Sequence, residues 1–280
     1  MKPTETATEV IVPPRSDRLV GSETLESELR RLQKYCIVEL EQVQRLHEWL
    51  DGKRLARSAC RLVGESRTGK TVACYAYHLK YPPILVWGRP PVVPVVYWHS
   101  PEDCGAREFL GGILDMLKYQ LSRGTISEMR SRVYQVLKAC QVEMLMIDEA
   151  HRLRSKTFSE VRDIFDKLGI AVVLVGTDRL EAATRRDEQV YNCFVACHRL
   201  QRLNAAQLVE VTAIWEMHVL KLPESSKLTS VKIQRLLGEA TRGYIGLLDT
   251  ILREAAMQAL QRGKSRIDFA TLQAAVQECQ

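Results

Sequence analysis

The 280-residue sequence contains no long apolar run. Its most apolar stretches, 142–147 and 170–175, are far shorter than the roughly 20 residues that a membrane-spanning helix requires. The first residues, MKPTETATEVIVPP, have neither the basic start nor the extended apolar stretch of a secretory signal. We therefore expect a cytoplasmic protein that does not contact a membrane.

Compositional bias and internal repeats are also absent. Hydrophobic residues make up 46% of the chain and charged residues 26%, which is typical of a globular protein and excludes disordered, fibrous and collagen-like classes. The length suits one large domain, or one domain with a small companion.

The eight cysteines show no paired CxxC spacing, which in a reducing compartment favours free thiols. Their one local cluster is Cys193, Cys197 and His198, with the two cysteines four residues apart on an expected helix. No second Cys or His pair stands nearby to complete four zinc ligands, so we interpret the two cysteines as buried thiols and not as zinc ligands.

Net charge is small, at +6, but it is unevenly distributed. Residues 61–141 hold 11 Lys and Arg against 6 Asp and Glu, so this segment contains five of the six excess charges. Such a local excess indicates an anionic partner, phosphate or nucleic acid. A solvated basic surface would give the same composition and stays an open alternative.

The pattern of apolar residues predicts an α/β domain followed by a helical one. Residues 1–21 have several prolines and no helical period, which is typical of a flexible tail. Two helices then lead into strands that alternate with helices, the arrangement of a parallel sheet covered on both faces. The strand signal stops near residue 203. We therefore expect a domain over 22–203 and an all-helical subdomain over 204–280.

A glycine-rich loop lies between the first expected strand and the next helix. It matches GxxxxGK[ST], the P-loop or Walker A motif, at every fixed position. Backbone N–H groups of such a loop wrap a polyphosphate, the lysine reaches the β- and γ-phosphates, and the final hydroxyl binds Mg²⁺. The expected ATP-binding residues are Gly64, Glu65, Ser66, Arg67, Thr68, Gly69, Lys70 and Thr71.

Two adjacent carboxylates end a later apolar strand, as in a Walker B motif. We expect Asp148 to hold the Mg²⁺ and its water shell, and Glu149 to polarise the attacking water. One further strand separates this pair from the P-loop, which is typical of hydrolytic P-loop proteins. The base-recognition motifs of GTPases are absent.

Two further positions complete the expected catalytic set. Thr177 follows the next apolar strand and would face the γ-phosphate, although it could instead cap the helix that begins near Asp178. Arg186, or its neighbour Arg185, lies after that helix and could reach the nucleotide of an adjacent subunit as an arginine finger. A solvated charge run is the alternative for these arginines.

In this order, the motifs resemble those of AAA+ ATPases over about residue 35 to the end. More narrowly, the blocks VGESRTGKT, VEMLMIDEAHRL, GIAVVLVGTDRL, RRDEQV and GYIGLLDTILREAA are similar to the TniB/TnsC regulators of DNA transposition, especially those of RNA-guided, CRISPR-associated transposons. The resemblance implies a P-loop NTPase fold: a five-stranded parallel sheet with helices on both faces and a small helical lid.

The resemblance also implies a prokaryotic, DNA-associated function. Such proteins form homo-oligomeric rings or helical filaments on double-stranded DNA, contacting its backbone without sequence preference. They select a target site, recruit a TnsB-like transposase, and bind a TniQ-like adaptor with its RNA-guided effector complex, and ATP hydrolysis drives disassembly. By position in the family's motifs, the DNA contacts match Arg107, Arg123 and Thr125, and the stretch beside the adenine matches Ile37 and Val38.

The expected lid departs from the family pattern at one position, and two alternative functions stay to be considered. Close relatives often carry arginine in GYIGxLD, where this chain has Leu247, so nucleotide sensing by the lid would need Arg253 or Arg242 instead. A helicase-loading or initiator-type AAA+ ATPase shares every nucleotide-site residue and stays open. A scaffold that binds ATP without turnover is disfavoured by Glu149.

Overall fold

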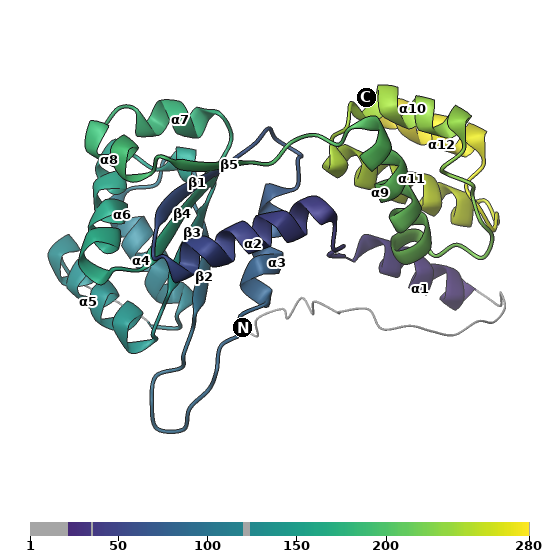
Figure 1. The fold of residues 1–280 in the computed structure, drawn as a ribbon. Coiled ribbons are helices and arrows are strands. Elements are labelled where there is room, and N and C mark those ends of the chain that lie inside the picture. Colours follow the sequence, from purple (N-terminus) through teal and green to yellow (C-terminus); the bar gives the residue numbers. More distant parts are fainter. Residues whose placement is uncertain (1–21, 35, 120–123, 280) are drawn as a thin grey trace. The chain divides into compact units, whose positions relative to one another are not determined.

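The computed structural model describes residues 22–34, 36–119 and 124–279 (Figure 1). Contacts divide the chain into two compact units. One is Glu41–Gln201, and the other joins the described part of 1–40 to the residues from 202 onward. The domain limits 22–203 and 204–280 remain a proposal. Among described residues, no helix is long and apolar enough to cross a bilayer.

The first unit is built on a parallel sheet of five strands, as predicted. Their order in the sheet is β2-β3-β4-β1-β5, and every neighbouring pair is parallel. The strands are β1 (Ala59–Val63), β2 (Val95–His99), β3 (Met144–Asp148), β4 (Ala171–Gly176) and β5 (Ala196–Arg199). β1, β3 and β4 are buried along their whole length. In the sequence β4 and β3, up to its final Asp148, therefore appear as continuous apolar runs, whereas the run of β1 is interrupted by Arg61.

Helices cover both faces of this sheet (Figure 1). On one face lie α2 (Glu41–Leu55) and α3 (Lys70–Leu79), packed on strand residues such as Leu62 and Val173. The next strand positions, such as Val63 and Leu174, face the opposite core. The helices of that face are α4 (Ala106–Met116), α5 (Ile126–Ala139), α6 (Ser155–Leu168), α7 (Arg179–Thr184) and α8 (Glu188–Cys193).

The structure corrects the expected helix around the cysteine cluster. Cys193 is the last residue of α8, whereas Cys197 and His198 lie on β5, so the two cysteines do not share a helical face. The strand is only four residues long and alternates half-buried with exposed positions. It forms because it pairs with β1, a contact that local sequence periodicity does not record.

Helix α2 continues past the Asp51–Gly52 pair at which the sequence predicts its end. Its last turn is fixed to α3: the Asp51 carboxylate accepts hydrogen bonds from the hydroxyls of Tyr77 (2.8 Å) and Tyr81. The Arg54 guanidinium stacks 4.3 Å from the Tyr81 ring centroid and pairs with Glu143 at the start of the β3 region. This polar network therefore holds α2, α3 and β3 together at the amino ends of the strands.

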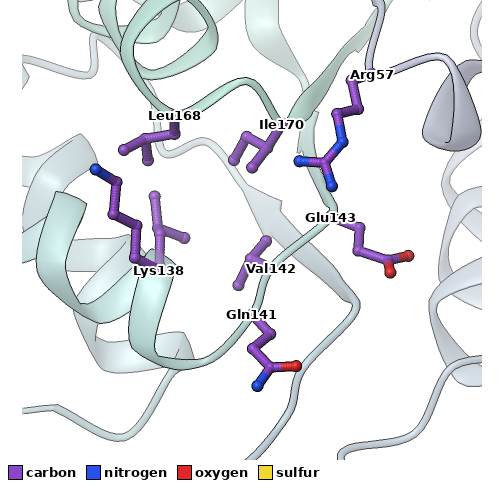
Figure 2. A pocket seen from close by; sticks show the side chains of 8 residues that line it. Arg57, Lys138, Gln141, Val142, Glu143, Leu168 and Ile170 are labelled. Atoms are coloured by element: carbon purple, nitrogen blue, oxygen red, sulfur yellow. The ribbon is translucent and has the colours of Figure 1, made fainter.

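A shallow hollow of about 350 Å³ lies at the same edge of the sheet. Figure 2 shows the side chains that line it. Two of its lining residues, Arg57 and Gln141, have left-handed backbone and follow α2 and α5. Gly169, which follows α6 between the lining residues Leu168 and Ile170, has the same backbone conformation. The Arg57 guanidinium donates to the Gly169 carbonyl (2.9 Å). The apolar side chains of Val142 and Ile170, which line the hollow, are already buried. The hollow is therefore a shallow gap between helix ends.

The proline-rich segment between α3 and β2 is a surface excursion, as predicted. Ile84 and Val92 exchange two backbone hydrogen bonds of 2.9 Å and form an isolated antiparallel bridge. Beyond the bridge, the Trp87 side chain is fully exposed.

The second unit is helical, which confirms the expectation for the C-terminal quarter. Its elements are α1 (Ser22–Gln33), α9 (Ala205–Ile214), a π-helical segment η2 (Trp215–Leu220), α10 (Val231–Thr241), α11 (Ile245–Gln261) and α12 (Phe269–Glu278). The predicted capping box of Asn204 and Gln207 opens α9. The Arg31 guanidinium of α1 donates to the carbonyls of Val219 (2.8 Å) and Leu220 (2.6 Å), closing the end of η2.

A pair of adjacent glycines in α4 tests how tightly this helix packs on the sheet. A Cβ at Gly112 would lie 2.2 Å from Nε1 of the buried Trp98, whereas a Cβ at Gly111 would meet only Met129 at 3.6 Å. Gly112→Ala should destabilise the protein by about 1–3 kcal/mol through overpacking. Gly111→Ala, its matched control, should stabilise by about 0.5–1 kcal/mol because alanine favours helix. Denaturant unfolding measures both, and equal effects would contradict this packing.

Candidate active site

The P-loop connects β1 to α3 through backbone that only some residues can adopt. Gly69, at the amino end of α3, has φ 90°, in the left-handed region that glycine adopts without strain. Gly64 has a different constraint, because a Cβ there would lie 2.6 Å from the Leu200 carbonyl oxygen. The outer turn, Ser66 and Arg67, is exposed. Glycine is therefore required at both fixed positions of the motif.

Inside the loop, the Glu65 carbonyl oxygen accepts two side-chain hydrogen bonds. They come from the Thr68 hydroxyl (2.8 Å) and the Lys70 ammonium (2.6 Å). Burial lowers the pKa of Lys70, although the nearby carboxylates of Glu149 and Asp148 oppose this shift. A buried ammonium with incomplete compensation is a site that an anion would stabilise.

Asp148 ends β3 as a fully buried carboxylate. Its Oδ2 accepts hydrogen bonds from the hydroxyls of Thr71 (2.8 Å) and Tyr97 (2.6 Å), and its Oδ1 accepts the backbone N–H of Glu149 (2.8 Å). Nδ1 of His99, at the end of β2, lies 3.7 Å from Oδ2. Three elements of the unit therefore meet at one carboxylate: the start of α3, β2 and β3.

Glu149 has φ 51°, a left-handed conformation that is strained for a residue with a side chain. The 3₁₀ turn η1 (Ala150–Arg152) follows at once and turns the chain away from the sheet. His151 Nδ1 lies 3.2 Å from Glu149 Oε2, but it is out of line for a hydrogen bond. Burial lowers the pKa of His151, which favours its neutral form beside this carboxylate.

Thr177 follows β4 at the same edge of the sheet. Its Oγ1 is buried and has no hydrogen-bond partner among the described residues, so the side chain does not cap α7. Asp178, the residue before α7, pairs with Arg199 at the end of β5 (2.7 Å). A buried hydroxyl without a partner at a strand end is the feature expected of a group that contacts a ligand.

These observations fit a bound nucleotide with its metal ion. The pairing of Val63 with Gly176 and of His99 with Asp148 brings the P-loop, Asp148 and Thr177 to one edge of the sheet. The adjacent hydroxyl of Thr71 and carboxylate of Asp148 are hard oxygen donors, the ligands that Mg²⁺ prefers. The buried ammonium of Lys70 and the unpartnered hydroxyl of Thr177 fit phosphate oxygens.

The two candidate fingers differ in their surroundings. Arg185 forms an ion pair with Glu181 (2.7 Å), and its guanidinium lies 5.0 Å from the Tyr191 ring centroid. Arg186 is exposed and makes no side-chain hydrogen bond, ion pair or ring contact within the described part of the chain. Only Arg186 therefore has a side chain that is free to engage a neighbour.

The expected DNA contacts lie at the amino ends of α4 and α5. The Arg107 guanidinium donates to the Gly124 carbonyl (2.8 Å), which brings Arg107 next to Thr125. The Thr125 hydroxyl accepts the Glu128 backbone N–H (3.3 Å) as the N-cap of α5. Arg123 lies outside the described residues. The structure thus places Arg107 and Thr125 together on the exposed surface at these two helix ends.

The remaining predicted residues belong to the helical unit. Ile37 and Val38 are half-buried in the segment before α2, and their role beside the adenine stays a proposal. Leu247 is half-buried in α11. The Arg253 guanidinium is bonded to Asp249 (2.7 Å) and to carbonyls of the α1 region, so it holds this unit together.

A protein-family model described as "Bacterial TniB protein" matches residues 32–203, which is more than half of the chain. The chain belongs to the TniB family. No curated protein matches this TniB chain.

Solved structures with a similar fold include Cdc6 and ORC proteins. Cdc6p from Pyrobaculum aerophilum has a TM-score of 0.71 and 19% identity, covering 89% of the TniB chain and 70% of its own. ORC2 from Aeropyrum pernix, in its ADPNP–ADP complexes, has a TM-score of 0.68 and 14% identity, covering 90% and 72%. ORC1 from the same organism, in complex with DNA, has a TM-score of 0.66 and 15% identity, covering 89% and 69%. The TniB protein has the AAA+ P-loop NTPase fold.

Four residues of the site have no sequence motif to reveal them: Tyr97, His99, His151 and Arg199. Tyr97 and His99 alternate on β2 and reach Asp148 only because β2 pairs with β3 in one register. Arg199 lies at the site only because β5 pairs with β1, and local sequence patterning does not predict that pairing. His151 lies two residues after Glu149, but the sequence does not predict that its ring lies against the Glu149 carboxylate.

The hydrogen bond from Tyr97 to the buried Asp148 can be tested by itself. Tyr97→Phe should lower the free energy of unfolding by about 1.5–3 kcal/mol, since hydrogen bonds to charged groups have that magnitude. Tyr75→Phe is the matched control, because the Tyr75 and Tyr97 ring centroids are 5.9 Å apart but the Tyr75 hydroxyl makes no hydrogen bond to any residue that the structure describes. The free energy of unfolding of Tyr75→Phe should differ from that of the wild type by no more than about 0.5 kcal/mol. Urea denaturation measures both variants. Equal losses of stability would show that the hydrogen bond from Tyr97 to Asp148 does not contribute.

Proposed function

We propose that this TniB protein is an ATP-dependent DNA-binding regulator of transposition, resembling TnsC of RNA-guided, CRISPR-associated transposons. The observation that carries the proposal is the convergence of Lys70, Thr71, Asp148, Glu149 and Thr177 at one edge of an AAA+ sheet in a TniB chain. In this function the protein assembles on double-stranded DNA, selects the target site and recruits the transposase.

The reaction is hydrolysis of ATP to ADP and phosphate. Water attacks the γ-phosphorus, the bond from phosphorus to the bridging oxygen breaks, and Glu149 accepts a proton from the water. Lys70 holds the β- and γ-phosphates, and Thr177 donates to a γ-phosphate oxygen. Mg²⁺, for which Thr71 and Asp148 are the ligands or water-shell partners, neutralises charge on the phosphates when it is bound.

A neighbouring subunit completes this site. Arg199 is paired with Asp178, so the arginine at the end of β5 is already committed within its own subunit. Arg186 is exposed and unpaired within the described residues, as a group that acts on another subunit must be. Since ATP then bridges two subunits, hydrolysis promotes disassembly of the ring or filament.

Binding to the DNA backbone uses the amino ends of α4 and α5. Arg107 and Thr125 lie together there and are exposed, Arg123 precedes Thr125 by two residues in the sequence, and each subunit adds a few such contacts. Repetition along an oligomer makes the binding strong without base recognition. The partners are a TnsB-like transposase and a TniQ-like adaptor with its RNA-guided effector complex.

The likeness to Cdc6 and ORC structures favours a second candidate, a helicase-loader or initiator-type ATPase. Both candidates have the same nucleotide site, so partner identity separates them. Affinity capture from the native cell with ATP present should return a transposase or a TniQ-like adaptor. Recovery of a replicative helicase would replace the proposal with its alternative.

Substitutions at the two ends of the nucleotide site should have opposite effects on assembly. Lys70→Ala should abolish ATP-dependent oligomers on DNA, because the phosphates lose their buried cation. Glu149→Gln should still bind ATP but slow hydrolysis by at least about 100-fold, so its oligomers persist. Light scattering after ATP is depleted measures the lifetime. Equal disassembly rates for Glu149→Gln and the wild type would show that hydrolysis does not drive disassembly.

Arg107→Ala should weaken binding to duplex DNA and reduce the slope of log affinity against log salt by about one per subunit contact. Thr125 is left intact in this variant, since it caps α5. Arg235→Ala on α10 is the control, because Arg235 is exposed and pairs only with Glu239 in its own helix. Fluorescence anisotropy at several salt concentrations gives both slopes, and identical slopes would exclude Arg107 from the DNA surface.

A further inference from the structure

Strand β1 carries a buried arginine at its centre. Arg61 is 6% exposed, and its Nε has no hydrogen-bond partner among the described residues. Burying a guanidinium without full compensation is unfavourable, and an aliphatic side chain would fill the same position without this desolvation. Arg61 is therefore not explained by packing of the core.

The contact that Arg61 does make is with Tyr191 on α8. Its guanidinium carbon lies 5.2 Å from the Tyr191 ring centroid, and that of Arg185, at the end of α7, lies 5.0 Å from the same centroid. Cation–π contacts are strongest when the cation is shielded from water, as Arg61 is. One aromatic ring thus connects β1 with both short helices that follow β4.

Glu181 completes the cluster from α7. It accepts hydrogen bonds from Arg185 Nη2 (2.7 Å) and Nε (3.1 Å). The hydrogen bond from Arg185 lowers the pKa of Glu181, and the charge of Arg61 adds to this shift. An ionised Glu181 offsets part of the positive charge around the ring, so both guanidinium groups can stay there.

Arg186 lies between two fixed residues. Arg185 is held by Glu181 and Tyr191, and the Asp187 carboxylate caps α8 by accepting the backbone N–H groups of Gln189 (3.0 Å) and Val190 (3.2 Å). Adjacent Cα atoms are about 3.8 Å apart, so these anchors fix where the Arg186 side chain starts.

We propose that Arg61, Tyr191 and Arg185 form a strut that positions Arg186 for the nucleotide of the neighbouring subunit. The inference rests on the proposed function, in which a second subunit completes the ATP site. Arg61 and Tyr191 are positioning residues, and Arg185 is an anchor and not the finger. Since β1 leads directly into Gly64, one strand carries the P-loop of its own site and supports the finger for the next.

The strut can be tested in the isolated protein without any assembly. In Tyr191→Leu, amides in 179–194 should exchange hydrogen about tenfold faster, because two ring contacts of this kind contribute roughly that factor. Exchange in the P-loop should not change. The matched control is Tyr134→Leu, which removes a ring contacting Lys167 (5.5 Å) elsewhere in the same unit. Unchanged exchange in 179–194 overturns the strut, whatever the function of the protein.

A mixing experiment tests the effect on the neighbouring site. Tyr191→Leu should lower kcat by about 10- to 100-fold through misplacement of Arg186, and Arg186→Ala by roughly 10³-fold, with the affinity for ATP unchanged in both. An excess of Glu149→Gln subunits, which bind ATP and carry an intact Arg186, should restore turnover at the sites of either variant. If Tyr191 merely stabilised its own subunit, the added Glu149→Gln subunits would not restore the turnover of Tyr191→Leu.

The outcomes separate the two proposals. If Arg186→Ala is not rescued, the shared active site of the proposed function is wrong. If Arg186→Ala is rescued but Tyr191→Leu is not, or if Tyr191→Leu mainly weakens ATP binding, the strut alone is wrong. Arg185→Gln should behave like Tyr191→Leu; a loss as large as that of Arg186→Ala would make Arg185 the finger.

Discussion

The buried carboxylate of Asp148 is the constraint on which the rest of the site depends. A fully buried charge is tolerated only when hydrogen bonds or cations surround it. Here the Thr71 hydroxyl, the Tyr97 hydroxyl and the Glu149 backbone N–H provide that environment. Satisfying this one group fixes the P-loop helix, the neighbouring strand and the turn that carries Glu149. The two groups that we propose as Mg²⁺ partners, the Thr71 hydroxyl and the Asp148 carboxylate, are thereby held next to each other.

The two edges of the sheet differ in how completely their polar groups are paired. At the carboxyl ends of the strands, polar groups are left with incomplete partners, as Thr177 and Lys70 are. At the amino ends, the network around Arg54 and Asp51 is satisfied within the subunit and holds the helices in place. Unsatisfied groups at one edge and satisfied groups at the other are the arrangement expected of a rigid scaffold with a ligand site.

Much of this architecture follows from the sequence. The P-loop spacing and the mostly apolar strands predicted the sheet and its nucleotide edge, and the end of the strand signal near residue 203 predicted the helical C-terminal quarter, because these patterns are local. The position of β5 was missed, since its four residues are a strand only through pairing with β1. The same limit applies to Tyr97 and to the Arg61–Tyr191 contact, which join residues 51 and 130 positions apart. The family resemblance, and not periodicity, supplied the DNA contacts.

We propose that ATP and DNA together assemble this TniB protein through shared nucleotide sites. Electron microscopy of the protein with duplex DNA and a non-hydrolysable ATP analogue tests this assembly. We expect rings or helical filaments that enclose the duplex, with nucleotide between subunits and Arg186 of one subunit facing the γ-phosphate of the next. Monomers on DNA, or an assembly whose nucleotide contacts a single subunit, would contradict it.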